Sequence, residues 1–427
     1  MFRPRANTEI QSSSRIISTY LALPNTSSVG RKKDDNRATL MLPDTTNVTA
    51  SIDVHRESPD IDLRQHSRNM QVELANSLHR RRAIYLDLKF WIGLRDAENT
   101  GGPSLYSDLL TTLRQAVSTG SAFCPISDSC FLEVFKQSDP ATRRKTAELI
   151  DELSLGVTII PFDIRVGTEI AHLLHAARTP DQVFRLDELV WTKLSYVLGY
   201  YSPQVSMFDH ATGQAIEKAF FDHMWTIPLT EMERLIGNSM PRGNPDHHAQ
   251  LADKLTQGIQ EHATDLRSFD QAYEHELVGV LDLYAGRAAD ILCDMAPPSL
   301  GPRPGKGTSE FKDIEQHCLG LLVAAMKTER GKKTLRTLHI ETCMHAAVRW
   351  NKGQKFKAND FFDYQHAAAA VGYCDAFFTE RSLSSVLTRS DMALDKLYGC
   401  TVVSTPETAL GYVSEIGTLT MPLVGPC

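Results

Sequence analysis

Four acidic residues stand where predicted strands end or predicted helices begin. Asp87 directly follows a short apolar run that is typical of a buried strand, and Glu380 lies just past the carboxyl end of another. Asp363 lies in the first turn of an alanine-rich helix, and Glu133 lies early in another helix. Because ligands of open α/β sheets bind beyond the carboxyl ends of the strands, we expect these acids to gather at one edge. Carboxylate oxygens gathered in this way suit hard cations such as Mg²⁺.

The elements that position these acids alternate between strand and helix. Apolar runs bounded by polar residues predict buried strands, and apolar residues at helical spacing between them predict helices. The predicted strands are residues 83–86, 122–126, 156–161, 376–378 and 400–404. This alternation favours an α/β fold, in which helices flank a parallel sheet.

A long stretch without strand signals interrupts this pattern and divides the chain into four segments. In the stretch, the predicted helices are residues 169–177, 186–198, 216–224, 229–236, 251–266, 273–295 and 311–326. The first segment is poor in apolar residues, so it can bury little surface to offset its ordering entropy. The expected segments are a flexible polar extension at 1–69, the first half of the α/β domain at 70–165, an all-helical insertion at 166–334, and the second half with a C-terminal tail at 335–427.

Composition restricts the function classes. The chain has 427 residues with 42% hydrophobic residues, as is ordinary for a soluble globular protein. Its net charge of −7 argues against a broadly basic nucleic-acid coat, so any nucleic-acid contact should be local. The eight cysteines form no Cys-x-x-Cys pair and predict reduced thiols in the cytoplasm. No apolar stretch approaches the roughly 20 residues that span a bilayer, so we expect no membrane partner.

The tail of the chain resembles that of the PIN-domain nucleases, a family of metal-dependent ribonucleases. In the family motif an aspartate opens an alanine-rich helix, and the strand that follows ends in threonine plus an acid. Here the motif reads Asp363-Tyr-Gln-His-Ala-Ala-Ala-Ala and then Asp375-Ala-Phe-Phe-Thr379-Glu380. The resemblance covers residues 83–165 and 335–410. It implies a PIN-like fold that hydrolyses phosphodiester bonds in RNA or, as the second choice, in single-stranded DNA.

The resemblance also implies that Asp87, Glu133, Asp363 and a fourth acid hold one or two Mg²⁺ or Mn²⁺ ions. The metal would activate a water molecule for attack on phosphorus. The fourth position departs from the family, because Arg381 stands where an aspartate or asparagine is usual. Glu380, the residue before it, is our first choice for the fourth acid.

Two other acids compete with Glu380 for this position. Asp360 lies one helical turn before Asp363 and shares its face, from which it can hold the metal through water. Asp375 precedes its strand and should lie at the opposite edge of the sheet.

Candidate substrate contacts lie beside the acids. Thr379 belongs to the motif, and Lys352, Lys355 and Lys357, interleaved with Trp350 and Phe356, precede the acidic site. The lysines would grip phosphate while an aromatic ring stacks on a base. A solvated basic linker is the alternative interpretation of these lysines. The resemblance adds a protein regulator or antitoxin as an expected partner.

Two other functions fit parts of the pattern. The irregular fourth acid suggests a PIN-like scaffold with impaired catalysis that binds RNA or a protein through the insertion. A haloacid-dehalogenase-like phosphatase also has an aspartate after its first strand, but its second aspartate is replaced by Lys89 here. His339 and His345 lie six residues apart, on different helix faces, which disfavours a zinc site between them.

Overall fold

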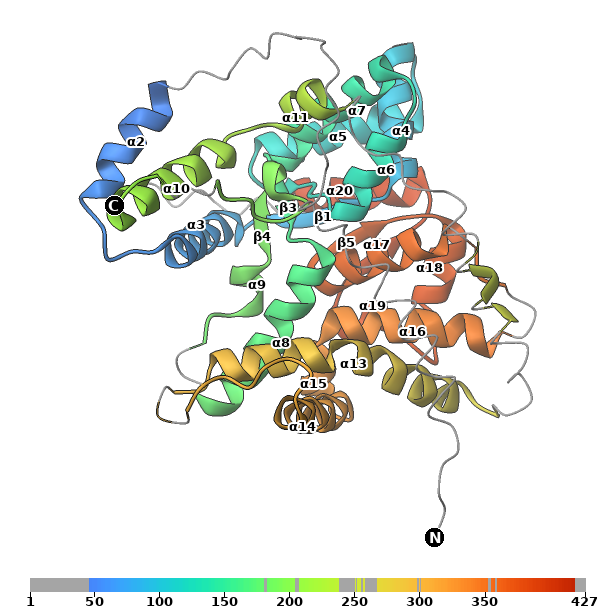
Figure 1. The fold of residues 1–427 in the computed structure, drawn as a ribbon. Helices are drawn as coiled ribbons and strands as arrows, with labels where there is room; N and C mark the ends of the chain where they lie inside the picture. Colours follow the sequence, from blue (N-terminus) through green and yellow to red (C-terminus); the bar gives the residue numbers. More distant parts are fainter. Residues whose placement is uncertain are drawn as a thin grey trace.

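The computed structural model describes residues 46–179, 183–203, 207–237, 250, 252–254, 256–257, 267–297, 299, 301–351, 355–357 and 359–418. Most of these residues are helical, and a small sheet lies in the middle of the molecule (Figure 1). Within this part of the chain no helix is both long enough and apolar enough to cross a membrane. The fold is a mixed α/β fold in which helices predominate.

Four parallel strands form the central sheet, in the order β2-β1-β5-β6. They are β1 Arg82–Leu86, β2 Ala122–Phe123, β5 Ala376–Phe378 and β6 Thr401–Val403. β1 pairs with β5 from Ile84 opposite Ala376 to Leu86 opposite Phe378. These four residues are fully buried, as expected for a parallel sheet that is covered on both faces. The prediction of a parallel sheet is confirmed for four of the five expected strands, whereas the strand expected at 156–161 lies in a separate sheet.

The direction of strand addition reverses between β1 and β5. From β1 the sheet extends to β2 on one side, whereas β5 and β6 lie on the other. The Asp87 N–H donates to the Phe378 carbonyl at 3.0 Å, which holds the carboxyl ends of β1 and β5 side by side. These two ends therefore flank a topological switch point, the place where open α/β sheets bind ligands.

A second, two-stranded sheet pairs β3, Val157–Ile159, with β4, Trp191–Lys193, in antiparallel orientation. We expected a helix at 186–198 within an all-helical insertion, and this prediction is wrong. Only α9, Leu186–Leu189, is an α-helix there. The aromatic and β-branched residues of β4 suit a strand, and their pairing covers an edge of β3 that would otherwise be exposed.

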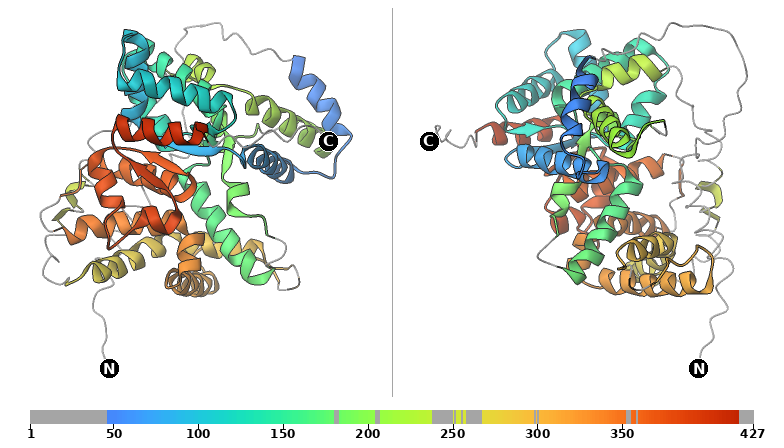
Figure 2. Two further views of the ribbon diagram at one scale, coloured as in Figure 1. Left: turned by 180° about the vertical axis from the view of Figure 1, so that it is seen from behind. Right: turned by 60° about the vertical axis from the view of Figure 1, so that its left-hand side comes forward.

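Helices cover both faces of the central sheet and continue into a further layer. Besides α9 they are α2 Thr46–Arg56, α3 Leu63–Leu78, α4 Leu88–Thr100, α5 Leu105–Ser118, α6 Asp128–Lys136, α7 Pro140–Ser154, α8 Phe162–Arg178, η2 Leu194–Tyr196, α10 His210–Trp225, α11 Leu229–Ile236, α13 Phe269–Asp294, α14 Ser309–Met326, α15 Glu329–Thr334, α16 Arg336–Trp350, α17 Asp360–Tyr373, α18 Arg381–Leu387, α19 Leu394–Tyr398 and α20 Pro406–Thr418. Figure 2 shows α4, α5 and α20 on one side of the sheet and α16 and α17 on the other. α13 packs against α16, and α14 packs against α13. The helix predicted at 251–266 lies largely outside the described residues.

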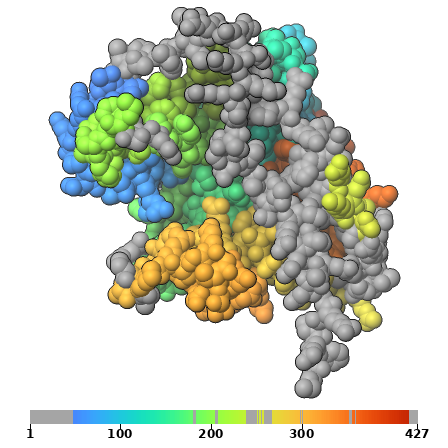
Figure 3. Space-filling view, viewed as in Figure 1, coloured from blue at the N-terminus to red at the C-terminus, as the bar shows by residue number. Residues whose placement is uncertain are grey.

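Two N-terminal helices, α2 and α3, occupy part of the segment where we expected a flexible extension at residues 1–69. The first 45 residues of that segment lie outside the described residues. Both helices pack against α10, and Figure 3 shows the blue atoms of α2 and α3 around the yellow-green atoms of α10. The Lys218 ammonium of α10 donates to the carbonyls of Ser58 and Ile61, each at 2.8 Å. Polar contacts thus anchor a segment whose apolar content is low.

A tight corner joins α14 to α15. A Cβ atom at Gly331 would lie 1.9 Å from the Ala325 carbonyl oxygen, so the backbone would have to move. We expect Gly331→Ala to lower the free energy of unfolding by about 1–3 kcal/mol. At Gly320, on α14, a Cβ atom would meet nothing within 4 Å. Gly320→Ala should therefore stabilise the protein by up to about 1 kcal/mol. Urea unfolding of both variants checks this difference, and equal stabilities would contradict it.

Candidate active site

Asp87 ends β1 and caps α4. Its Oδ1 accepts a hydrogen bond from the Phe90 N–H at 3.3 Å, so the residue does serve as a helix cap. Asp87 is also buried, and this burial raises the pKa of its carboxyl to about 6, although His366 and the Thr379 hydroxyl favour the ionised form. A carboxyl group that is costly to ionise therefore lies at the carboxyl end of β1.

The other predicted acids lie near Asp87 at the same edge of the sheet. Burial, together with the charges of Glu133 and Asp360, raises the pKa of Asp363 to about 7, although His366 favours the ionised form. Glu380 occupies the N-cap position of α18 without a side-chain cap hydrogen bond. It is exposed, and its charge raises the pKa of both Asp363 and Asp87. The structure therefore brings together the acids that we expected to gather there.

His366 lies among these acids and was not predicted. Its Nε2 donates to Glu133 Oε2 at 2.8 Å, and its Nδ1 is hydrogen-bonded at 2.6 Å to the Tyr85 hydroxyl, which in turn bonds Ser127. Burial opposes the protonation of His366, but the hydrogen bond to Glu133 and the nearby negative charges outweigh it and raise the pKa. The signal in the sequence was its position three residues after Asp363, on the same helix face.

Two further side chains border the site. The Lys136 ammonium lies 3.4 Å from the centre of the Phe362 ring, one helical turn after Glu133. Tyr106, from α5, lies close enough to Asp87 for the carboxylate to add to the effect of burial in raising the tyrosine pKa. Only the three-residue spacing of Lys136 from Glu133 could have been noticed in the sequence.

Thr379 and Asp360 both lie at this edge of the sheet. The Thr379 Oγ1 atom is buried and makes no hydrogen bond of ordinary geometry within the described residues, although it lies near Asp87. Asp360 accepts a hydrogen bond from the Lys357 N–H at 2.9 Å, and burial raises its pKa. An unpartnered hydroxyl beside buried carboxylates leaves donor and acceptor capacity for a ligand.

Asp375 lies at the opposite edge, as expected. Its carboxylate accepts hydrogen bonds from Arg82 Nη1 at 2.6 Å and from the Ala83 N–H at 2.8 Å. Both partners belong to the first residues of β1, so Asp375 sits beside the amino ends of the strands. It is therefore not the fourth acid of this site.

The basic stretch before α17 is exposed but offers no aromatic platform through Phe356. Lys355 and Lys357 are exposed, whereas Lys352 lies outside the described residues. Phe356 is only 7% exposed and stacks on Phe361, so the expected stacking of its ring on a base is not supported. Any contact of this stretch with a nucleic acid would rest on charge.

The most compact group of metal-ligating atoms lies elsewhere. Atoms of His55, His66 and Asp222 lie within 4.8 Å of one another, and no other trio of His, Cys, Asp or Glu in the described part of the chain is this close. The carboxylates at the sheet edge are thus more widely spread. His339 and His345 are buried within α16 and form no such group.

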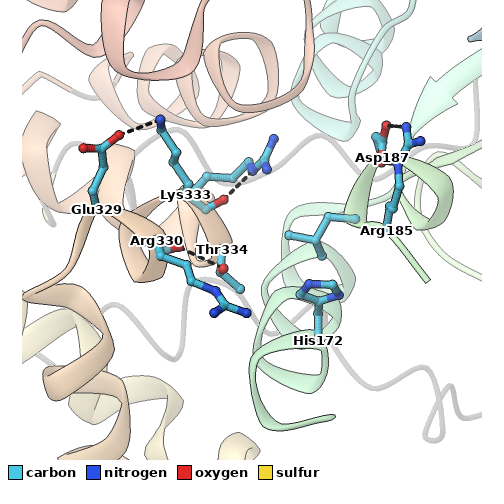
Figure 4. A pocket seen from close by; sticks show the side chains of 9 residues that line it. His172, Arg185, Asp187, Glu329, Arg330, Lys333 and Thr334 are labelled. Atoms are coloured by element: carbon cyan, nitrogen blue, oxygen red, sulfur yellow. Dashed lines mark hydrogen bonds and ion pairs between the residues drawn. The ribbon is translucent and has the colours of Figure 1, made fainter. Parts of the chain in front are cut away.

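A pocket of 710 Å³ opens between α8, α9 and α15 (Figure 4). Four cationic side chains line it, but Arg185 pairs with Asp187 and Lys333 pairs with Glu329 in the pocket wall. In Figure 4, Arg330 extends toward His172. None of the acids at the sheet edge lines this pocket, so it is separate from the candidate active site.

Comparison of the chain with protein-family models, with curated proteins and with solved structures found no match. The resemblance to PIN-domain nucleases therefore rests on the sequence motifs alone.

Proposed function

We propose that the chain is a PIN-like, metal-dependent nuclease that hydrolyses RNA. The observation that carries this proposal is the convergence of Asp87, Glu133 and Asp363 from three different elements at the switch point of a parallel sheet. Glu380 borders the same place from a fourth element. Structural acids of this kind are normally paired with basic groups, whereas burial raises the pKa of Asp87 and Asp363 here. Perturbed carboxyls gathered at a ligand-binding edge are typical of functional sites.

The donor set fits Mg²⁺ or Mn²⁺. Asp87, Glu133 and Asp363 would hold the ion, with Glu380 at the exposed rim, because hard oxygen ligands suit these cations. A bound ion would lower the pKa of its water and neutralise charge on the phosphoryl oxygens. Ionised carboxylates are costly to bury without a cation, so the raised pKa values of Asp87 and Asp363 indicate a site that a cation would stabilise.

The side chains around the acids position them. His366 holds the Glu133 carboxylate at 2.8 Å and is itself fixed by Tyr85 at 2.6 Å. The α4 backbone fixes Asp87 through the Phe90 N–H. Preorganised ligands of this kind need little rearrangement when the substrate phosphate arrives.

RNA is the substrate that we favour, and charge supports its binding. Lys355 and Lys357 are exposed beside Asp360, and Lys136 lies over the ring of Phe362, the residue before Asp363. The net charge of the chain is negative, so these lysines would provide a local contact with phosphate.

Cleavage of end-labelled single-stranded RNA by the purified protein tests the function. Cutting is expected in Mg²⁺ or Mn²⁺ and not in EDTA. The products are expected to carry a 5′-phosphate and a 3′-hydroxyl, with water attacking phosphorus and the 3′-oxygen leaving. Single-stranded DNA of the same sequence is the parallel substrate. A protein that binds the metal at the acids and cuts neither polymer would contradict the proposal.

The lysines beside α17 yield a separate prediction for binding. The double variant Lys355→Ala/Lys357→Ala should weaken RNA binding and reduce its salt dependence by about 1.4 in log–log slope, since each single-strand phosphate contact contributes about 0.7. Binding in EDTA, measured by fluorescence anisotropy over a salt series, checks this. The matched control is Lys312→Ala/Lys327→Ala, which removes two exposed lysines elsewhere. Equal slopes for the two double variants would show that the basic stretch is a solvated linker.

A PIN-like scaffold with impaired catalysis is the second candidate. The exposed position of Glu380 favours this candidate. So does the spacing of the acids, whose carboxylates lie farther apart than the ligating atoms of His55, His66 and Asp222. RNA binding that persists while no metal-dependent cleavage is detected would support it over the nuclease.

A further inference from the structure

Two histidines and an aspartate meet where three helices pack together, and none of the three belongs to the acids at the sheet edge. His55 of α2 donates from Nε2 to Asp222 Oδ2 at 2.6 Å, and His66 of α3 donates from Nε2 to Asp222 Oδ1 at 2.6 Å. The two imidazole rings lie edge to face with centroids 4.8 Å apart. Three nitrogen and oxygen donors thus converge between α2, α3 and α10.

The cluster is partly buried and held in shape by its neighbours. The side chains of His55, His66 and Asp222 are 11%, 16% and 30% exposed, so the cluster is accessible to solvent, most of all at the aspartate. The Ser51 hydroxyl donates to Asp222 Oδ2 at 2.9 Å, and the His66 ring packs edge-on against Phe221. An ion can enter such a site, and the donors need little reorientation to hold it.

We propose that His55, His66 and Asp222 form a zinc site. Imidazole nitrogens and a carboxylate suit Zn²⁺, whereas Mg²⁺ prefers oxygen ligands alone. In a tetrahedral site with bonds of about 2.0–2.1 Å, neighbouring donors stand about 3.3 Å apart. The two nitrogen–oxygen contacts of 2.6 Å therefore have to open by less than 1 Å, and the donor atoms, which lie within 4.8 Å of one another, have to close where they are farther apart than this. Zinc would bind each neutral imidazole through Nε2, with the ring proton on Nδ1, and water completes the coordination.

The site would fasten the N-terminal helices to the body of the protein. From residue 48 onward no residue of α2 is fully buried, so apolar packing contributes little to the docking of this helix. The contacts that hold α2 include those of Ser51 and His55 with Asp222. Zinc in place of the shared protons would link α2, α3 and α10 through one ion and so stabilise their packing.

Isothermal titration of the full chain with Zn²⁺ tests this proposal, with Mg²⁺ in excess to occupy the carboxylates at the sheet edge. One tight zinc per chain is expected. His66→Gln and Asp222→Asn should each weaken it by more than about 100-fold, because changes even to the partners of metal ligands often cost 10–100-fold. The matched control is His79→Gln, which removes an exposed histidine that also lies on the N-terminal side of β1. This control should bind zinc as the unaltered chain does.

A readout that needs no variant completes the test. Zinc should slow proteolysis within residues 46–66, and Co²⁺ in the same place should give the intense visible absorption of a four-coordinate ion. The proposal is overturned if the unaltered chain binds no zinc tightly, if Co²⁺ gives only the weak spectrum of a six-coordinate ion, or if His66→Gln binds zinc as well as His79→Gln does. In each of those cases the cluster is a hydrogen-bonded His-Asp-His group.

Discussion

The Asp363→Asn variant is expected to lose metal-dependent cleavage of single-stranded RNA by about 100-fold or more. The substitution keeps the shape of the side chain but removes a charged oxygen ligand, and losses of this size follow even from changes in the partners of metal ligands. Asp87→Asn should behave in the same way because it removes the acid from the other side of the switch point. Initial rates of cutting in Mg²⁺ and in Mn²⁺ check the prediction.

The same variant should keep or gain stability, which separates a functional residue from a structural one. Burial raises the pKa of Asp363 from 3.8 to about 7. Because the folded pKa is raised, the carboxyl of Asp363 costs the folded state stability progressively as the pH rises from about 4 to about 7. Asp363→Asn removes that cost, so its melting temperature in EDTA at pH 8 should equal or exceed that of the unaltered chain. Mg²⁺ should raise the melting temperature of the unaltered chain and leave that of the variant unchanged.

Asp375→Asn is the matched control. Like Asp363, Asp375 precedes β5 in the chain, but it lies at the opposite edge of the sheet. It loses an ion pair with Arg82 at 2.6 Å, which is partly exposed, so a small loss of stability and full cleavage activity are expected. The two variants should therefore show opposite patterns. Cleavage that survives Asp363→Asn, or that a folded Asp375→Asn variant loses equally, would refute the assignment of the active edge.

Local patterns in the sequence predicted most of the sheet. The runs at 83–86 and 376–378 became β1 and β5 because continuous apolar residues need burial on both faces. Asp139 followed by Pro140 is the cap-then-proline order that favours a helix start, and the two residues begin α7, with the aspartate accepting the Thr142 N–H at 2.8 Å. β4 was missed because its stability comes from pairing with β3, a contact that helical periodicity within 186–198 does not report.

The candidate site was predictable in its acids and not in their neighbours. Asp87 and Glu380 could be placed because a strand end fixes where the next residue lies. The hydrogen bond between His366 and Glu133 joins residues 233 positions apart, so it cannot be predicted from local spacing in the sequence. The same holds for Phe356, whose burial depends on how the basic stretch folds back onto α17.

The burial of helix α16 could not be predicted from its sequence pattern. Its residues from 337 to 348 are all buried, although several of them are polar. Glu341 is one of them, and its Oε2 atom has no hydrogen-bond partner within the described residues. Burial raises the pKa of Glu341 to about 8, although Arg165 of α8 favours its ionised form. Arg165 is itself fully buried and also influences Glu169, whose pKa burial raises to about 7.

Glu341→Gln should therefore stabilise the protein in a pH-dependent way. The carboxyl titrates near 4.5 in the unfolded chain and near 8 in the folded one. As the pH rises between those two values, the carboxyl is ionised in the unfolded chain and still protonated in the folded one, so the unaltered chain loses stability. The glutamine variant cannot ionise and does not show this loss. The full shift corresponds to about 5 kcal/mol at 1.36 kcal/mol per pKa unit. We expect about half of it, because buried sites relax around a charge and Arg165 compensates part of it.

Urea unfolding at pH 5, 7 and 9 checks this prediction as a difference between variant and unaltered chain. The buried histidines, such as His339 with its pKa lowered by burial to about 3, also make stability depend on pH, but they cancel in that difference. The stability gain should be small at pH 5 and approach about 2–3 kcal/mol at pH 9. Glu274→Gln, an exposed glutamate of α13, is the control and should show no gain at any pH. A gain that is the same at all three pH values would mean that repacking, and not the buried charge, sets the stability of α16.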